Sequence, residues 1–263
     1  VRNDWHHWSF LKLYLGFVCF AWFKLLCIGL TVFVCWLLLK IYTFNVKDLN
    51  KIDDKLRSQI NSISNYGGLM FSLSSGVYTI RKKIDVNYEE YLGKNYKEIK
   101  TPSNKNHHAV IIVNHVSWLD ILILMNCIGS GFIASIAVSK FPFIGTICSS
   151  IGSIYVDRDS KAERNNSLNI VEDKLTSIYE KKVNSGLIIF PEGTTSNGTC
   201  LLPFKKGAFS KLYPVKPYIL KIDPVNRISL AMDIIEMTTH LLIIVCCPYY
   251  IVELIEYPVF SPN

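Results

Sequence analysis

A histidine and an aspartate lie close together in the segment NHVSWLD, where they could act as a base and its partner. His115 comes two residues after the apolar run 109–113, which is typical of a buried strand, and Asp120 comes five residues later. With His115 in a turn and Asp120 in the first turn of a helix, the two side chains can meet. Such an aspartate fixes the tautomer of the imidazole and leaves its other nitrogen free to take a proton. In a second interpretation, Asn114 or Ser117 caps the helix and His115 is an ordinary turn residue.

A second polar segment, FPEGTTSNGT, follows another apolar run at 186–190. This run breaks at Pro191 into Glu192, Gly193 and Thr194, which bring a carboxylate, a hydroxyl and backbone N–H groups to the end of a strand. A turn of this composition can hold a phosphate, and the glycine permits a close approach of the backbone. An ordinary polar turn is the alternative interpretation.

Two further segments carry less information by themselves. The strand-like run at 151–156 leads to Arg158, whose fork of N–H donors suits a phosphate. The alternative is a surface arginine, because an aspartate lies close to it on each side. The segment PVKPYIL at 214–220 predicts a strand whose entry is shaped by Pro217.

The elements that must position these residues alternate between strands and helices. The expected strands cover residues 76–80, 109–113, 133–138, 153–156, 186–190, 215–220 and 250–256. Helices are expected at 118–127 and 160–184, and a connecting loop at 87–108. This alternation predicts an α/β fold with a mostly parallel sheet flanked by helices, in which the polar loops gather where strands end.

The N-terminal part of the chain is different in character. Residues 10–39 are almost wholly apolar, and we expect residues 1–45 to form a membrane-embedded helical anchor. The uninterrupted piece 25–39 has 15 residues, whereas a straight span needs about 20. A tilted span, a re-entrant hairpin and a helix within one leaflet therefore all stay open. Lys24 and Lys40 bracket this piece and can extend toward lipid headgroups.

Two parts follow the expected anchor. Residues 46–75 carry apolar side chains at helical spacing, which predicts an amphipathic connecting helix. Residues 76–263 contain all four polar segments and are expected to form one domain. The first residue is Val rather than Met, which indicates a fragment or a processed form.

The overall composition agrees with contact between the chain and lipid. Half of the 263 residues are apolar and 19% are charged, which is more apolar than is usual for a purely soluble protein. The net charge of +7 favours anionic lipid headgroups, phosphates or acyl-CoA. A nucleic-acid partner is not expected, because no arginine-rich aromatic motif is present. The eight cysteines show no Cys-x-x-Cys spacing, so neither a metal site nor a disulfide framework is predicted.

Taken together, the four polar segments resemble, in order and spacing, the four blocks of the glycerol-phosphate and lysophospholipid acyltransferase family (PlsC-like). The matching positions are His115 with Asp120, Gly152 with Arg158, Phe190–Gly193, and Pro217. The stretch 192–209 and the end of the chain at 252–262 look most like the lysophosphatidylcholine acyltransferase branch. The resemblance covers about residues 76–262 and implies that 76–263 is an acyltransferase domain.

The resemblance also implies a reaction and a role for each residue. An acyl group would pass from acyl-CoA to the free hydroxyl of a lysophospholipid, either lysophosphatidylcholine or lysophosphatidic acid. His115 would be the general base, and Asp120 would orient it. Glu192 would contact a hydroxyl or position Arg158. The residues expected around the phosphate and glycerol of the acceptor are Arg158, Glu192, Gly193, Thr194 and Pro217.

The same resemblance implies the surroundings of the reaction and leaves alternatives. No metal or prosthetic group is implied; acyl-CoA is a co-substrate, the lipid bilayer is a partner, and the endoplasmic reticulum membrane is the expected location. A glycerol-3-phosphate acyltransferase and a CoA-independent phospholipid transacylase are alternative enzymes. A non-catalytic membrane scaffold is a different class of function. Asn165 and Asn197 begin glycosylation sequons, which would be used only in a lumenal protein.

Overall fold

The computed structural model describes residues 7–46, 48–49, 52–93, 96, 110–157, 161–180, 186–223, 230–232 and 235–261. Within these residues, seven strands form one sheet in the order β1-β7-β6-β2-β5-β3-β4. The strands are β1 (Val77–Lys83), β2 (Val110–Val113), β3 (Gly131–Ser135), β4 (Ile154–Val156), β5 (Leu187–Ile189), β6 (Val215–Asp223) and β7 (Tyr250–Glu256). Neighbouring strands are parallel, except that β6 and β7 are antiparallel. The predicted α/β fold with a mostly parallel sheet is confirmed.

The central strand β2 is buried on both faces. Its side chains alternate between two apolar cores, since Ile111 and Val113 belong to one cluster and Val110 and Ile112 to the other. A parallel sheet that helices cover on both faces needs apolar side chains on both faces. This requirement explains why β2 and β5 appear in the sequence as continuous apolar runs rather than as alternating ones.

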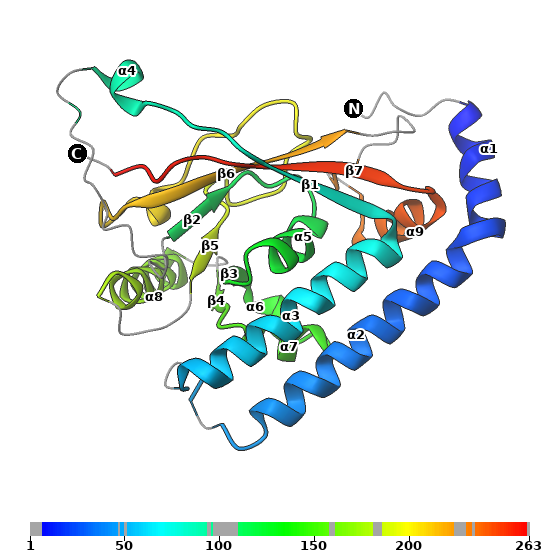
Figure 1. Cartoon of the computed structure of the whole chain (residues 1–263), viewed down its shortest axis with the longest axis horizontal. Helices are drawn as coiled ribbons and strands as arrows, with labels where there is room; N and C mark the ends of the chain where they lie inside the picture. Colours follow the sequence, from blue (N-terminus) through cyan, green and yellow to red (C-terminus); the bar gives the residue numbers. More distant parts are fainter. Residues whose placement is uncertain are drawn as a thin grey trace.

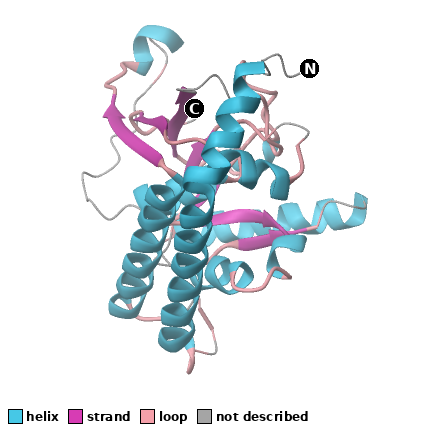
Figure 2. Ribbon diagram, turned by 90° about the vertical axis from the view of Figure 1, so that its right-hand side faces the viewer, coloured by secondary structure: helices cyan, strands magenta, loops and turns pink. Residues whose placement is uncertain are grey.

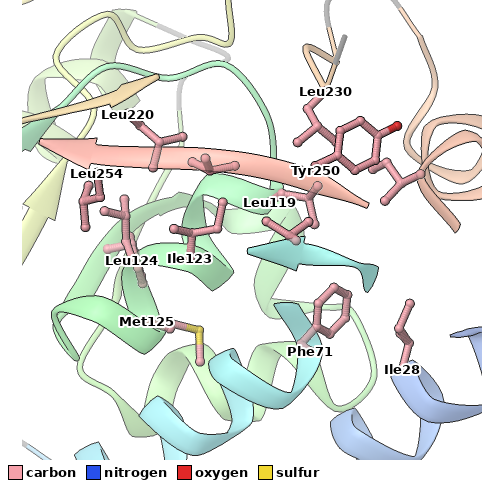
Figure 3. Close-up of a cluster of buried hydrophobic side chains, with 14 of the residues drawn as sticks. Ile28, Phe71, Leu119, Ile123, Leu124, Met125, Leu220, Leu230, Tyr250 and Leu254 are labelled. Carbon is pink, nitrogen blue, oxygen red and sulfur yellow. The ribbon is translucent and has the colours of Figure 1, made fainter. Parts of the chain in front are cut away.

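Different helices cover the two faces of the sheet (Figure 1). On one face, α8 (Lys161–Tyr179) packs through Val171, Leu175 and Ile178. On the other face, α5 (Leu119–Cys127) lies against the sheet and α3 (Asp54–Ser75) packs on α5. Figure 3 shows this second core, in which Ile123 of α5 faces Leu220 of the sheet. The site described below is thereby held on a rigid frame.

The N-terminal region forms one long helical run. It consists of α1 (His7–Gly16), the π-helical turn η1 (Phe17–Ala21) and α2 (Trp22–Thr43). Within it, Phe10–Thr43 is long and apolar enough to cross a membrane. The helices α2 and α3 lie side by side over most of their length (Figure 2). A re-entrant hairpin inside residues 10–39 is therefore not formed, because the chain turns back only after Thr43.

The orientation of Lys24 differs from the prediction. Its side chain does not extend toward headgroups but is buried, with 9% exposed. The ammonium group donates hydrogen bonds to the carbonyl oxygens of Ser75, Cys247 and Pro248, at 3.1, 2.6 and 3.1 Å. The helix carries Lys24 inward because α3 and the last helix, α9 (Met237–Cys246), end beside it and leave carbonyl groups without helical partners.

Several element boundaries also differ from those expected. The helix α3 begins at Asp54, because the Asp53 carboxylate caps it by accepting a hydrogen bond from Leu56 N at 3.2 Å. The strand β3 ends at Ser135, where a short helix replaces the expected extension. The helices that the sequence did not predict are α4 (Tyr88–Leu92), α6 (Ile136–Ser139), α7 (Ile144–Ser150) and α9. The predicted division into three parts stays a prediction.

Candidate active site

Two loops meet at one edge of the sheet because their strands are neighbours. The strands β2 and β5 are parallel, with Ile112 opposite Ile189, so their carboxyl ends lie together (Figure 1). His115 follows β2 and the Pro-Glu-Gly turn follows β5. A backbone hydrogen bond of 2.9 Å from Ser196 N to the carbonyl oxygen of His115 joins the two loops. The sheet thus brings together segments that lie far apart in the sequence.

The predicted contact between His115 and Asp120 is present. His115 Nδ1 lies 2.9 Å from Asp120 Oδ2, and the Asp120 side chain is fully buried. The same Oδ2 atom accepts hydrogen bonds from the backbone N–H groups of Val116 and Ser117, at 2.7 and 2.9 Å. These N–H groups precede α5, whose N-terminus also favours a negative charge. This carboxylate therefore holds the histidine and also binds N–H groups at the start of the helix, a role that the second interpretation gave to Asn114 or Ser117.

A stacking contact fixes the plane of the His115 ring. The ring of Phe190 lies 4.0 Å from it, centroid to centroid, with 17° between the planes. The imidazole remains 16% exposed and lines a cleft. A carboxylate at Nδ1 favours the tautomer with its proton on Nδ1 and the lone pair on Nε2. No described residue forms a hydrogen bond with Nε2, so this atom can accept a proton from a bound molecule.

Glu192 connects the two loops instead of facing solvent. Its side chain is 2% exposed. Oε1 accepts a hydrogen bond from His115 N at 2.8 Å, and Oε2 accepts one from Leu202 N at 3.0 Å. The carboxylate therefore fixes the backbone of the histidine relative to the loop after β5. Its predicted contact with a substrate hydroxyl, or with Arg158, stays a prediction.

The other predicted site residues fall into three groups. Gly193 and Thr194 line the same cleft as His115. Pro217 does not line it and lies inside β6, opposite Ile112 of β2. Arg158 lies outside the described residues, although the preceding residue, Asp157, lines the cleft.

The cleft has a volume of about 400 Å³ and two kinds of lining. The loop after β5 contributes polar groups, namely the hydroxyl groups of Thr194 and Thr195 and the ammonium group of Lys205. The walls from β3, β4, α6 and α8 are largely apolar, and they include Ile133, Val138, Val156, Leu168 and Val171. This arrangement suits a molecule with a polar reacting end and an apolar part.

Two supporting contacts were missed by the sequence analysis. The Asn114 side chain continues the pairing of β2 with β6, because its Nδ2 donates to Leu220 O at 2.9 Å and its Oδ1 accepts from Leu220 N at 2.7 Å. The Trp118 indole N–H donates to Nδ1 of the buried His240 at 3.0 Å. These partners lie 106 and 122 residues away in the chain. No local pattern could have connected them.

The comparison with protein families agrees with this site. A family model described as Acyltransferase matches residues 84–222, which include His115, Asp120, the Pro-Glu-Gly turn and Pro217. The match covers more than half of the chain. This chain belongs to the acyltransferase family. The family assignment made from the four polar segments is therefore confirmed, and it agrees with the predicted class of enzyme.

Relatives of this acyltransferase include several that are named for lysolipid substrates. Lysophospholipid acyltransferase LPEAT1 of Arabidopsis thaliana is 38% identical over 156 residues, 59% of this chain and 39% of the relative. The lyso-ornithine lipid O-acyltransferase of Rhodobacter capsulatus is 32% identical over 121 residues, 46% of this chain and 41% of that protein. The lysophosphatidylcholine acyltransferase of Drosophila melanogaster is 30% identical over 117 residues, 44% of this chain and 21% of that protein. The matched part is thus less than half the length of each of these relatives.

A solved structure resembles almost the full length of this chain. The 1-acyl-sn-glycerophosphate acyltransferase PlsC of Thermotoga maritima matches with a TM-score of 0.53 over 97% of this chain and 88% of that one. The two sequences are 15% identical. The likeness therefore shows a common fold, including the helices before the sheet.

Proposed function

We propose that this chain transfers an acyl group from acyl-CoA to the free hydroxyl of a lysoglycerophospholipid such as lysophosphatidylcholine or lysophosphatidic acid. The observation that carries the proposal is the 2.9 Å contact between His115 Nδ1 and Asp120 Oδ2, with the imidazole lining the cleft. Family membership supports acyl transfer, and the relatives named for lysolipids support the choice of acceptor.

In the proposed reaction, His115 is the general base. Its Nε2 takes the proton of the acceptor hydroxyl as the oxygen attacks the thioester carbonyl of acyl-CoA. Asp120 stabilises the imidazolium that forms. When the carbon–sulfur bond breaks, the imidazolium returns the proton to the departing thiolate, which leaves as CoA. Base catalysis of this kind contributes roughly 10²–10⁴-fold to a rate.

The two kinds of lining in the cleft suit the proposed substrates. The apolar walls from β3, β4 and α8 are appropriate for an acyl chain, because its transfer from water into such a site is favourable. The hydroxyl and ammonium groups from the loop after β5 are appropriate for glycerol and phosphate.

A membrane location follows from the same proposal. Lysophospholipids reside in bilayers, and Phe10–Thr43 has the length and apolar character to insert into one. We expect the chain to be bound to the endoplasmic reticulum membrane. Fractionation tests this point, because an inserted chain stays with membranes after an alkaline carbonate wash. A chain released by that wash would contradict insertion.

The function is tested with membranes that contain the wild-type chain or the His115→Ala variant. Each is incubated with acyl-CoA and a panel of lysophospholipids, with glycerol-3-phosphate as a further acceptor. Wild type should acylate at least one lysophospholipid, and His115→Ala should lower kcat by roughly 10²–10⁴-fold. Equal rates for the two proteins would contradict the role of His115.

Two controls separate the alternatives. Omission of acyl-CoA in the presence of intact phospholipids detects a CoA-independent transacylase. Thermal unfolding of both proteins in detergent detects a loss of folding, which is not expected for His115→Ala because the ring is partly exposed. If wild type transfers no acyl group to any acceptor while remaining folded, the scaffold hypothesis replaces the enzyme.

A further inference from the structure

Lys205 supplies a positive charge that the proposed chemistry at His115 does not use. Its side chain lines the same cleft as His115 and Thr194. Its ammonium group forms no ion pair with any residue in the described part of the chain, whereas Lys211 pairs with Glu172 at 3.1 Å. An unpaired ammonium in a largely apolar cleft is available to an anionic ligand.

Gly193 provides the space in which the Lys205 side chain lies. Gly193 has a φ of +71°, and a Cβ atom at this position would come within 2.7–2.9 Å of Nζ, Cδ and Cε of Lys205. Any larger residue would therefore push the lysine from its position over the turn. The glycine in the Pro-Glu-Gly turn thus allows the turn itself and also leaves room for the lysine side chain.

The backbone around Lys205 is held in a fixed relation to His115. Lys205 N donates a hydrogen bond to the carbonyl oxygen of Pro191 at 2.8 Å. Nearby, Leu202 N and His115 N donate to the two oxygens of the same Glu192 carboxylate, at 3.0 and 2.8 Å. One buried carboxylate therefore positions both the proposed base and the loop that carries the cation.

We propose that Lys205 binds a phosphate group of a substrate, either the phosphate of the acceptor or a phosphate of CoA. This inference rests on the proposed function, and it names the chemical group that Lys205 binds in the proposed active site. Among the described residues that line the cleft, Lys205 is the only lysine or arginine, and Asp157 is the only aspartate or glutamate. The hydroxyl groups of Thr194 and Thr195 lie in the same lining and can add hydrogen bonds to phosphate oxygens.

The test compares substrates that differ by a phosphate. The acceptors are the lysophospholipid that wild type acylates and a monoacylglycerol with the same chain; the donors are acyl-CoA and acyl-pantetheine. Lys205→Ala should raise the KM of one phosphate-bearing substrate about tenfold, the worth of one charge-assisted hydrogen bond. It should leave the KM of the matching phosphate-free compound unchanged. The substrate whose KM rises identifies the source of the phosphate, and Lys205→Arg should restore most of the affinity.

Lys206→Ala is the matched control, because Lys206 is the next lysine in the chain, is exposed and does not line the cleft. It should behave as wild type. The proposal is overturned if Lys205→Ala leaves the KM of both phosphate-bearing substrates unchanged, or if Lys206→Ala has an equal effect.

Gly193→Ala provides a second way to displace the ammonium. It should raise the same KM as Lys205→Ala, and it should raise it no further when Lys205 is already alanine. Gly198→Ala is its control, since Gly198 lies in the same loop with a similar φ of +75° but its Cβ would meet Val116 at 3.3 Å. An equal effect of Gly198→Ala would show that backbone strain, and not the lysine, is responsible, and it would overturn the role of Gly193.

Equilibrium binding measurements test this inference independently of the proposed reaction. Radiolabelled lysophospholipid and CoA are bound at equilibrium to the His115→Ala protein in lipid nanodiscs, with and without Lys205→Ala. If wild type transfers no acyl group but Lys205→Ala weakens binding of either probe about tenfold, the phosphate site stands and the proposed reaction fails. Equal binding with and without Lys205→Ala overturns the phosphate site whatever the activity.

Discussion

Asp120 and Lys24 are both charged and buried, and backbone groups at the ends of helices hold each of them. Asp120 accepts hydrogen bonds from two backbone N–H groups just before α5. Lys24 donates to carbonyl groups where α3 and α9 end. Each charge therefore lies at the end of a helix dipole that suits its sign. The same physical rule operates at the cleft and at the junction of the N-terminal helix with the sheet domain.

The two regions differ in whether an atom of the held side chains is left without a hydrogen-bond partner. Asp120 also holds His115, whose other ring nitrogen has no partner among the described residues. Lys24 directs its ammonium group to three carbonyl oxygens, which matches its three donors. Burial of a charge thus does not by itself indicate chemistry. A chemical role requires a side chain that is held through one atom while another of its polar atoms can interact with a bound molecule.

The largest effect is expected at the cleft. Asp120→Asn should lower kcat by roughly 10²–10⁴-fold, because the neutral amide neither fixes the His115 tautomer nor stabilises its imidazolium. Acyl transfer from saturating acyl-CoA measures the change. If the variant kept more than half of the wild-type kcat, the role of Asp120 would be purely structural, as is the role of Lys24.

A smaller effect, on stability rather than on chemistry, is expected at the helix junction. Lys24→Met keeps an apolar stem but leaves three carbonyl groups without their donor, which should lower the free energy of unfolding by about 2–4 kcal/mol. Thermal unfolding in detergent measures this loss. The kcat per folded molecule should stay at the wild-type value, and a selective fall in kcat would show that Lys24 takes part in function.

The smallest effect is expected for an ion pair at the surface of the sheet. Lys216 Nζ lies 2.7 Å from Glu256 Oε1, with 30% and 32% of the two side chains exposed. Burial raises the pKa of Glu256, but the hydrogen bond and charge of Lys216, the hydrogen bond with Tyr218 and the charge of Lys83 together outweigh it, so this pKa lies below its ordinary value. Lys216→Met should cost less than about 1 kcal/mol, because solvent screens such pairs.

The depressed pKa of Glu256 also predicts how this cost depends on pH. The stabilisation is present above the ordinary pKa of glutamate and is lost as the pH falls through the lower pKa of the folded state. Unfolding curves of wild type and Lys216→Met should therefore differ at neutral pH and converge in acid. A difference that grows in acid would contradict the pairing.

Much of the sheet domain could be predicted because its signals are local. The runs that became β2 and β5 are apolar on both faces, and the polar segments after them mark the loops where chemistry gathers. The helix α9 could not be predicted with the same rules. Its sequence, MTTHLLIIVC, is rich in residues that also favour strands, and its burial depends on contacts with α1 and η1.

The sequence by itself determined the fold class, the acyltransferase family and the pairing of His115 with Asp120, because these depend on order and short spacing. Only the tertiary structure decided the direction of Lys24, the use of Glu192 as a link between two loops and the position of Lys205 over Gly193. Each of these three depends on partners from distant parts of the chain or on the path of a folded loop. Hydrogen bonds form wherever packing brings donors and acceptors together, and linear spacing does not contain that information.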